Sequence, residues 1–215
     1  MMRDEVVHVS SDFLHLLKTR RSIRIYLSKK IPELLIHRVL EAATWAPSAH
    51  NAQPWRFIVI TNQEMKQKLA EAMANKWAED LARDNVSPEV RKNLVEASIN
   101  RFVRPPILIL ACVTLEEMDE YVDERRRRFE YLMATQSLAA AVQNLLLAAH
   151  SEGLGSCWFC APLFCQEVVR KVLGIPVDVE PQALITLGYP SEKPEPTPRK
   201  PLKEVVFKDR WGKVF

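Results

Sequence analysis

Residues 107–113, ILILACV, form an unbroken apolar run in the middle of the chain. A short run of this kind predicts a strand that is buried on both faces, at the centre of a sheet. Three further strands are predicted outward from it, over residues 55–61 (WRFIVIT), 154–160 (LGSCWFC) and 183–187 (ALITL). Helical segments separate these strands, so the sequence predicts an α+β domain in which helices surround a small mixed sheet.

Helices are predicted from capping residues, proline positions and the spacing of apolar side chains. They cover residues 12–20, residues 32–46, residues 65–104 with a break near Pro88, residues 116–151 as one helix or as two that meet near Glu124, and residues 163–173. The second half of residues 116–151 is rich in alanine. Small side chains let another helix approach closely, so this helix is the expected centre of a dimer.

The C-terminal arm, residues 190–215, is predicted to begin as a stiff, extended connector. Five of the fourteen prolines fall within residues 190–201, and such a segment has no regular hydrogen-bonded structure. Val205, Val206 and Phe207 then predict one last apolar strand. A strand at the end of an arm could pair with a sheet edge in a second subunit.

The composition indicates one globular domain over residues 1–215, with a flexible N-terminus over residues 1–11. Hydrophobic residues make up 47% and charged residues 27% of the chain. The formal net charge is only +3, so no nucleic-acid partner is expected. The five glycines cannot form G-x-G-x-x-G or G-x-x-x-x-G-K-[ST], so a phosphate would have to be bound by side chains.

No membrane partner is expected, and the predicted location is cytoplasmic. The longest weakly polar run, residues 137–149, is too short to span a bilayer and contains Gln143 and Asn144. The first residues lack the apolar stretch of a signal peptide. Four cysteines in a chain of this length do not form a disulfide framework.

Cys157, Cys160 and Cys165 raise the question of a metal or redox motif. Structural zinc takes four ligands, and the remaining cysteine, Cys112, falls in a predicted buried strand. Alternate residues of a strand face opposite sides, which would separate Cys157 from Cys160. The spacing therefore favours neither a metal site nor a disulfide.

Two polar segments could bind a ligand. In RRSIR (residues 20–24), an extended backbone would place Arg20, Ser22 and Arg24 on one side, a donor set suited to a phosphate and a neighbouring carbonyl. In PSAHNAQPW (residues 47–55), two carboxamides could bind the mixed donor and acceptor edge of a heterocycle. The alternatives are a solvated basic edge strand for the first segment and an ordinary helix-to-strand connection, with a structural histidine, for the second.

Together these motifs resemble the flavin-dependent nitroreductase family. RRSIR is followed in family order by APSAHNAQPWRF (residues 46–57), by the alanine-rich helix, by GLGSCWFCAP (residues 153–162) and by RKPL (residues 199–202). The resemblance covers nearly the whole chain, residues 13–212. It implies a nitroreductase-like fold with a mixed, mostly antiparallel sheet and a C-terminal arm exchanged in a homodimer, which binds one FMN at each of two subunit interfaces.

The resemblance also assigns roles to individual positions. The phosphate and pyrimidine edge of FMN would be held by Arg20, Arg21, Ser22 and Arg24. The same flavin would be reached from the other subunit by Pro47, Ser48, Ala49, Asn51 and Gln53. The strand end that lies against the central ring would be Trp158, Phe159, Cys160 and Ala161. The C-terminal arm would close on the phosphate with Arg199 and Lys200.

The activity implied is that of an FMN-dependent NAD(P)H oxidoreductase acting on nitroaromatics, quinones or related conjugated acceptors. Hydride would pass from NADH or NADPH to the flavin N5, and the acceptor would then take the same place, which is a ping-pong scheme. No catalytic side chain is required. Residues 65–104 would form the roof of the pocket, where Trp77 and Phe102 either stack on an acceptor or belong to the core.

Other interpretations stay open at this stage. Similar sequences act in deazaflavin cofactor biosynthesis and in the reductive dehalogenation of iodinated tyrosines. Residues 65–104 lack the tyrosine that the dehalogenases use there, which counts against that branch. A flavin-carrying electron-transfer or storage protein and a non-flavin anion-binding module are alternatives of other classes.

Overall fold

A computed structural model describes residues 11–215, so residues 1–10 of the predicted flexible N-terminus lie outside the described part of the chain. Its centre is an antiparallel sheet of four strands in the order β1-β2-β4-β3. The strands are β1 (Trp55–Ile60), β2 (Ile107–Thr114), β3 (Gly155–Phe159) and β4 (Val179–Gly188).

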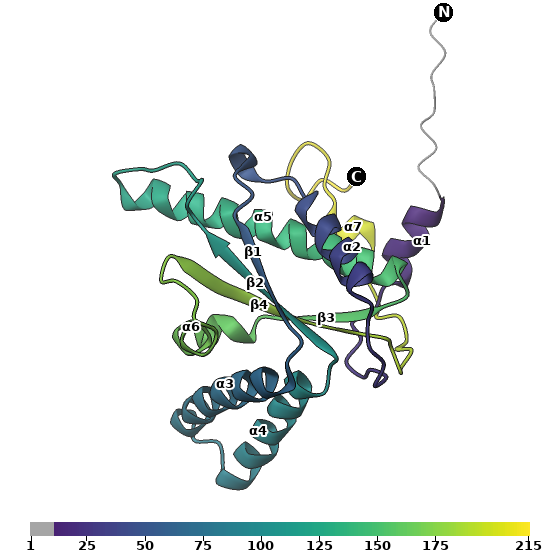
Figure 1. The fold of residues 1–215 in the computed structure, drawn as a ribbon. Coiled ribbons are helices and arrows are strands. Elements are labelled where there is room, and N and C mark those ends of the chain that lie inside the picture. The colour runs from purple at the N-terminus through teal and green to yellow at the C-terminus, as the bar shows by residue number, and fades with distance from the viewer. Residues whose placement is uncertain (1–10) are drawn as a thin grey trace, which may run out of the picture.

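Helices cover both faces of the sheet (Figure 1). One face packs against α2 (Glu33–Thr44) and α5 (Glu124–Ser151), with α1 (Ser11–Thr19) beside the C-terminal end of α5. The other face packs against α3 (Gln63–Arg83), α4 (Pro88–Val103) and α6 (Gln166–Leu173). The short elements are η1 (Ala49–Asn51), η2 (Ala161–Phe164) and α7 (Leu202–Val205).

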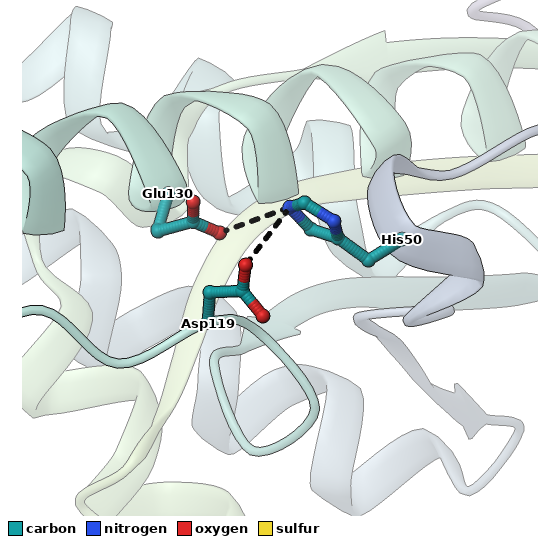
Figure 2. Close-up of side chains that lie close together, drawn as sticks. All are labelled: His50, Asp119 and Glu130. Atoms are coloured by element: carbon teal, nitrogen blue, oxygen red, sulfur yellow. Dashed lines mark ion pairs between the residues drawn. The ribbon is translucent and has the colours of Figure 1, made fainter.

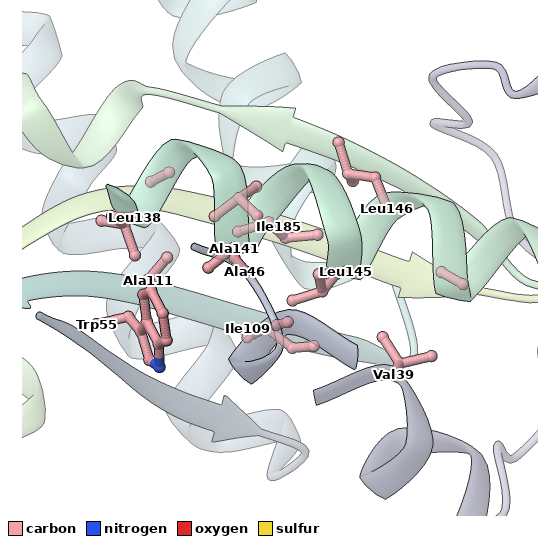
Figure 3. Close-up of a cluster of buried hydrophobic side chains, with 14 of the residues drawn as sticks. Val39, Ala46, Trp55, Ile109, Ala111, Leu138, Ala141, Leu145, Leu146 and Ile185 are labelled. Atoms are coloured by element: carbon pink, nitrogen blue, oxygen red, sulfur yellow. The ribbon is translucent and has the colours of Figure 1, made fainter. Parts of the chain in front are cut away.

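The β2 strand is buried along its whole length, as its apolar run predicts. Ile109 and Ala111 face the α5 side, where they meet Leu145 and Ile185 in one cluster (Figure 3). Leu108, Leu110 and Cys112 face the α3 side and belong to a second cluster. A central strand covered on both faces needs apolar residues at every position, which explains the unbroken run.

A register shift between Ala111 and Cys112 follows from the proline opposite them. Ala111 pairs with Ala183, whereas Cys112 pairs with Pro181, so Gln182 is the additional residue of β4. Proline has no N–H to give to a sheet, and within sheets it is tolerated at such bulges. Beside the bulge, Gln182 donates to the hydroxyl of Tyr131 (3.1 Å), which in turn donates to Glu180.

Close packing brings the basic segment, residues 20–24, against β3. Ser22 and Ser156 form an isolated parallel bridge, and the Ile23 N–H donates to the Ser156 carbonyl (3.0 Å). A Cβ added at Gly155 would lie 2.8 Å from the Ile23 side chain. A residue without a side chain is therefore needed at position 155 for the segment to lie this close. This bridge adds a parallel contact to the antiparallel sheet.

Most helix predictions are confirmed, with changes at the ends. The helix predicted over residues 116–151 begins at Glu124, because the Asp123 side chain caps it by accepting from the Arg126 N–H (2.9 Å). Residues 65–104 divide into α3 and α4, with Pro88 at the start of α4. The helix predicted over residues 163–173 is divided into η2 and α6 at Cys165.

The strand predicted at Val205, Val206 and Phe207 is wrong. Pro201 precedes one helical turn, α7, and Phe207 then forms an isolated bridge with Val214. The ring of Phe207 packs on that of Trp211 at a centroid distance of 4.6 Å. These apolar side chains thus find partners within the arm itself.

Within residues 11–215, α5 is the one helix long and apolar enough to cross a membrane by length and composition. Half of its most apolar window is buried inside the domain. The core helix of a globular domain has the same properties, so α5 gives no clear membrane signal.

Candidate functional site

The basic segment lies against β3, where Ser22 bridges Ser156. Burial raises the pKa of the neighbouring Cys157 thiol, and Arg24, a hydrogen bond from Ser22, and Arg20 oppose that rise. Arg21 donates to the carbonyls of Lys18 and Arg20 (both 2.8 Å). That Arg20, Ser22 and Arg24 share one side of the segment stays a prediction.

Arg20 and Arg21 also line a hollow of about 560 Å³. Its other walls include Asp12 on α1, His150 at the end of α5, and Glu192 and Lys193 from the connector. Burial lowers the pKa of His150, and Arg20 and Arg21 lower it further. The Arg20 and Arg21 guanidinium groups are the donors that an anion would meet in this hollow, beside the carboxylates of Asp12 and Glu192.

Contacts on both sides hold the basic segment in place. The hydroxyl of Tyr26 donates to the Ile23 carbonyl and lies 2.6 Å from the Thr186 hydroxyl. A Cβ at Gly188 would lie 2.6 Å from the Tyr26 ring, so glycine is required there as well. Glu192 accepts hydrogen bonds from the main-chain N–H groups of Arg24 (2.6 Å) and Ile25 (3.0 Å). The segment is therefore fixed by the sheet and by the connector.

The polar loop, residues 47–53, is held by fewer contacts. The Ala49 N–H donates to the Ser137 hydroxyl on α5 (3.2 Å), and the Gln53 N–H donates to the Ser48 hydroxyl (3.1 Å). His50, Asn51 and Gln53 all adopt positive φ angles, between 47° and 56°. This is a left-handed conformation that costs energy for residues other than glycine.

The exposed side of the polar loop carries unused hydrogen-bonding groups. Pro47, Asn51 and Gln53 are exposed. Within residues 11–215, neither the Asn51 nor the Gln53 carboxamide has a hydrogen-bond partner. The structure thus leaves both carboxamides open to a ligand.

The basic segment and the polar loop do not meet within one chain. The loop contacts α5 at Ser137, whereas the hydroxyl of Thr19, just before the basic segment, contacts His150 on the same helix (3.0 Å). Thirteen residues of α5 separate these two contacts, which corresponds to about 20 Å along the helix axis. A ligand held by both groups would need the loop of a second chain.

A pocket of about 380 Å³ lies where β3 ends, beneath the α3–α4 hairpin. Phe159, Cys160 and Ala161 line it from the sheet side. From the hairpin it is lined by Met73, Lys76, Trp77, Asp80, Asp84, Ser98, Arg101 and Phe102. The pocket and the basic segment both adjoin β3, the segment at Ser156 and the pocket at Phe159.

The pocket combines aromatic surface with charges of both signs. Phe102 packs edge-on against Phe159 at 5.3 Å, and the Arg101 guanidinium lies 5.6 Å from the centroid of the Phe159 ring. Lys76 forms ion pairs with Asp80 (3.2 Å) and Glu79 (3.7 Å). Such a pocket can hold a flat aromatic molecule that carries polar substituents.

The two aromatic residues considered for the roof differ in burial. Phe102 is 1% exposed and belongs to the core, whereas Trp77 is 36% exposed and faces the pocket. Sequence patterns did not identify Lys76, Asp80, Arg101 or Phe164 as pocket residues. The spacing of Lys76 and Asp80 is also typical of a solvated helix face, so only the three-dimensional fold identifies them.

The strand-end residues differ from one another in orientation. Trp158 packs on the α5 side, where its Nε1 is buried without a hydrogen-bond partner among the described residues. Phe159 packs on the α3 side. Cys160 lies just beyond β3 and is exposed, and all four cysteines are free thiols.

The arm residues Arg199 and Lys200 stay apart from the basic segment in the single chain. Both are exposed, and Arg199 donates to the hydroxyl of Thr197 (2.7 Å) and to carbonyls of its own segment. The connector that leads to them is fixed at Glu192 by Arg24 and Ile25. Their closure on a phosphate stays a prediction.

Comparison with known proteins agrees with this arrangement. Residues 17–189 match the model of the nitroreductase family. A protein of Methanothermobacter thermautotrophicus with the provisional name NADH dehydrogenase/NAD(P)H nitroreductase is 36% identical over 188 residues, which is 85% of this chain and 80% of the relative. A protein of the same provisional name from Archaeoglobus fulgidus is 32% identical over 184 residues, 84% of this chain and 86% of the relative.

Solved structures share the fold. A provisionally named nitroreductase from Desulfovibrio desulfuricans, crystallised in complex with FMN, superposes with a TM-score of 0.71 at 25% identity and covers 94% of this chain and 99% of its own. A BluB-like flavoprotein from Clostridium difficile 630 superposes with a TM-score of 0.78 at 24% identity, over 94% of this chain and 100% of its own. The family match, which spans most of the chain, and the shared fold lead to one conclusion: the chain belongs to the nitroreductase family.

Proposed function

We propose that this protein is an FMN-dependent NAD(P)H oxidoreductase that reduces nitroaromatics, quinones or related conjugated acceptors. The observation that carries the proposal is the bridge of the segment that contains Arg20, Ser22 and Arg24 to β3, the strand whose end lines a pocket with aromatic walls. The names of the archaeal relatives and the FMN complex of the Desulfovibrio protein support an oxidoreductase with this cofactor. A cytoplasmic location is part of the same proposal.

The donors present fit FMN. A phosphate dianion needs several cationic donors where no glycine-rich loop supplies main-chain amides, and Arg20 lines a hollow together with Arg21 and Lys193. The carboxamides of Asn51 and Gln53 are open and can bind the mixed edge of a pyrimidine ring. When bound, FMN supplies two-electron chemistry, because it accepts hydride from NADH or NADPH and gives it to an acceptor.

The protein's own residues would tune and shield this chemistry. The Arg24 guanidinium would favour the negative charge that the reduced cofactor carries, which is a form of electrostatic preorganisation. Phe159 and Trp77, with Phe102 packed behind Phe159, would hold a flat donor or acceptor and exclude water. One pocket that serves both substrates in turn requires a ping-pong sequence.

A homodimer would complete the site. The basic segment and the polar loop contact α5 about 20 Å apart in one chain. α5 also leaves apolar side chains uncovered on its outer face, including Phe129 (46% exposed) and Leu132 (44% exposed). Pairing of two such helices would bury these side chains and bring the loop of one chain to the basic segment of the other.

The absorbance spectrum of the purified protein tests the cofactor, and anaerobic titration with NADH and with NADPH tests the donor. We expect a flavin spectrum that either or both nucleotides bleach. Arg20→Ala combined with Arg199→Ala should lose FMN and keep the native circular dichroism spectrum. Arg104→Ala combined with Arg210→Ala removes the same charge from exposed positions and should keep FMN. A colourless wild-type protein that ignores added FMN contradicts the proposal, and full flavin content in the first double variant contradicts the phosphate assignment.

Mixed dimers test the shared site. Arg20→Ala damages the basic segment, and Asn51→Ala with Gln53→Ala damages the polar loop. If each site takes one part from each chain, random mixing of the two variants restores about a quarter of the sites, because half of the dimers are mixed and each holds one intact site. If both parts come from one chain, mixing restores none.

A further inference from the structure

Three ligand-type side chains from three separate segments meet near the N-terminal end of α5. His50 comes from the polar loop, Asp119 from residues 115–123, and Glu130 from the second turn of α5 (Figure 2). The His50 Nε2 lies 3.5 Å from the Glu130 Oε2 and 4.0 Å from the Asp119 Oδ2. One ligand atom from each residue lies within 4.8 Å of the other two.

Glu130 differs from an ordinary surface carboxylate because it is buried. The residue is 5% exposed, and its Oε2, the atom aimed at His50, has no hydrogen-bond partner within residues 11–215. The separation of 3.5 Å from the His50 nitrogen exceeds the length of a good N–H···O bond, about 2.7–3.2 Å. A buried carboxylate oxygen without such a bond is costly unless a cation neutralises it.

No arginine of the neighbouring basic run supplies that cation in the described part of the chain. Arg127 lines the same hollow as Asp119 and Glu130, yet it forms no ion pair with either carboxylate. Arg126 instead pairs with Asp123, the residue that caps α5. Two carboxylates therefore share one imidazole.

We propose that His50, Asp119 and Glu130 bind a divalent metal ion of the zinc type. Zinc bonds to nitrogen and oxygen are about 2.0–2.2 Å long, so tetrahedral ligand atoms lie about 3.3–3.5 Å apart. The His50–Glu130 separation already has this value. The Asp119 oxygen lies 4.0 Å from the His50 Nε2 and within 4.8 Å of the Glu130 oxygen, and it has to approach both atoms, which an exposed side chain can do. One imidazole with two carboxylates suits Zn²⁺ rather than Mg²⁺ or Ca²⁺, which prefer oxygen ligands alone. Water would take the fourth position.

The metal would tie the polar loop to α5. The ligand His50 directly precedes Asn51, and the loop otherwise contacts α5 through the Ser137 hydroxyl. Binding of Zn²⁺ would thus fix the two open carboxamides relative to the helix. The site itself does not depend on the proposed function, because all three ligands and the ion can be tested without cofactor or activity.

Calorimetric titration of the untagged, chelator-treated full-length protein with Zn²⁺, together with its melting temperature, tests the proposal. We expect one Zn²⁺ per chain, a higher melting temperature with Zn²⁺, and no comparable binding of Mg²⁺. Glu130→Gln keeps the shape of the side chain and removes its buried charge, so it should fold and bind Zn²⁺ about a hundredfold or more weakly. His50→Asn changes an exposed position and should lose the binding in the same way.

A matched control separates this site from adventitious binding by surface histidines. His37→Asn removes an exposed histidine of α2 that is not part of the cluster, and it should bind Zn²⁺ as the wild type does. The proposal is overturned if the wild type binds no Zn²⁺, if His50→Asn or Glu130→Gln binds it as tightly as the wild type, or if His37→Asn weakens binding as much as they do.

Discussion

The basic segment and the polar loop, the two groups of donors in the proposed site, are held in contrasting ways. The basic segment is pressed against β3 at Gly155, bonded to Ser156, and fixed from outside by Tyr26 and Glu192. The polar loop contacts α5 through the Ser137 hydroxyl and the His50–Glu130 ion pair, and it contains three left-handed residues. The sheet thus fixes the position of the basic segment, the fixed half of the site, whereas a bound ligand can change the conformation of the polar loop, the adjustable half.

The largest effect is expected from Gly155→Val, which displaces the basic segment, the fixed half of the site. The added Cβ would lie 2.8 Å from Ile23, so the basic segment has to move away from β3. Overpacking of this kind costs about 3 kcal/mol of stability, and we expect FMN to bind about tenfold or more weakly. Urea denaturation and fluorescence titration with FMN measure the two effects.

Gly174→Ala serves as the control for this change. Gly174 ends α6 with φ at +66°, and a Cβ there would meet nothing within 4 Å. The left-handed conformation alone should cost about 1 kcal/mol and leave FMN binding unchanged. Equal loss of FMN binding in both variants would mean that general destabilisation, and not the position of the basic segment, explains the first result.

A smaller effect is expected from Ser137→Ala in the adjustable half. The change removes the hydroxyl that accepts from the Ala49 N–H, and a lost hydrogen bond costs about 1 kcal/mol. Hydrogen exchange should become faster in residues 47–53 and stay unchanged in residues 20–24. Faster exchange in both regions would show that the two halves are coupled within one chain, contrary to the contrast described above.

The two halves also differ in what the sequence could predict. The extended backbone of residues 20–24 was predicted from local sequence and agrees with the bridge between Ser22 and Ser156, whereas the common side of Arg20, Ser22 and Arg24 stays a prediction. The positive φ angles of His50, Asn51 and Gln53 could not be predicted, since asparagine and histidine adopt them only where the surroundings require it. The cluster of His50, Asp119 and Glu130 joins segments that lie 69 and 80 positions from His50, and no local pattern reports such a contact.

The same distinction holds for the fold. The apolar run of β2 and the prolines at positions 32 and 88 correctly predicted β2 and the starts of α2 and α4, because these features depend on local sequence alone. The strand at Val205, Val206 and Phe207 was predicted wrongly because these residues suit a strand, yet a strand needs a neighbouring edge. In the single chain that edge is not reached, and the ring of Trp211 covers Phe207 instead. Exchange of the arm with a second chain stays a prediction. The pocket under α3 and α4 likewise depends on how a hairpin packs on a distant strand end.

The smallest effect that we expect to distinguish the basic segment from the polar loop is a difference in the reactivity of the cysteine thiols. Cys160 is exposed, whereas Cys112, Cys157 and Cys165 are buried. Burial raises the pKa of Cys112 to about 12 and that of Cys165 to about 11, and it raises the pKa of Cys157 as well. Because the thiolate is the reactive form, a disulfide reagent at pH 8 should label one thiol rapidly in the native wild type and four after denaturation.

Cys157 then reports on the basic segment that covers it. In Gly155→Val it should become a second rapidly labelled thiol, whereas Ser137→Ala should keep the wild-type pattern. The raised pKa values of the buried thiols also predict how stability depends on pH. Above pH 9 the unfolded chain ionises thiols that the folded protein keeps protonated, so the free energy of unfolding should fall as the pH rises. Rapid labelling of Cys157 in the unchanged protein would mean that the basic segment opens freely, and the division into a fixed and an adjustable half would then be wrong.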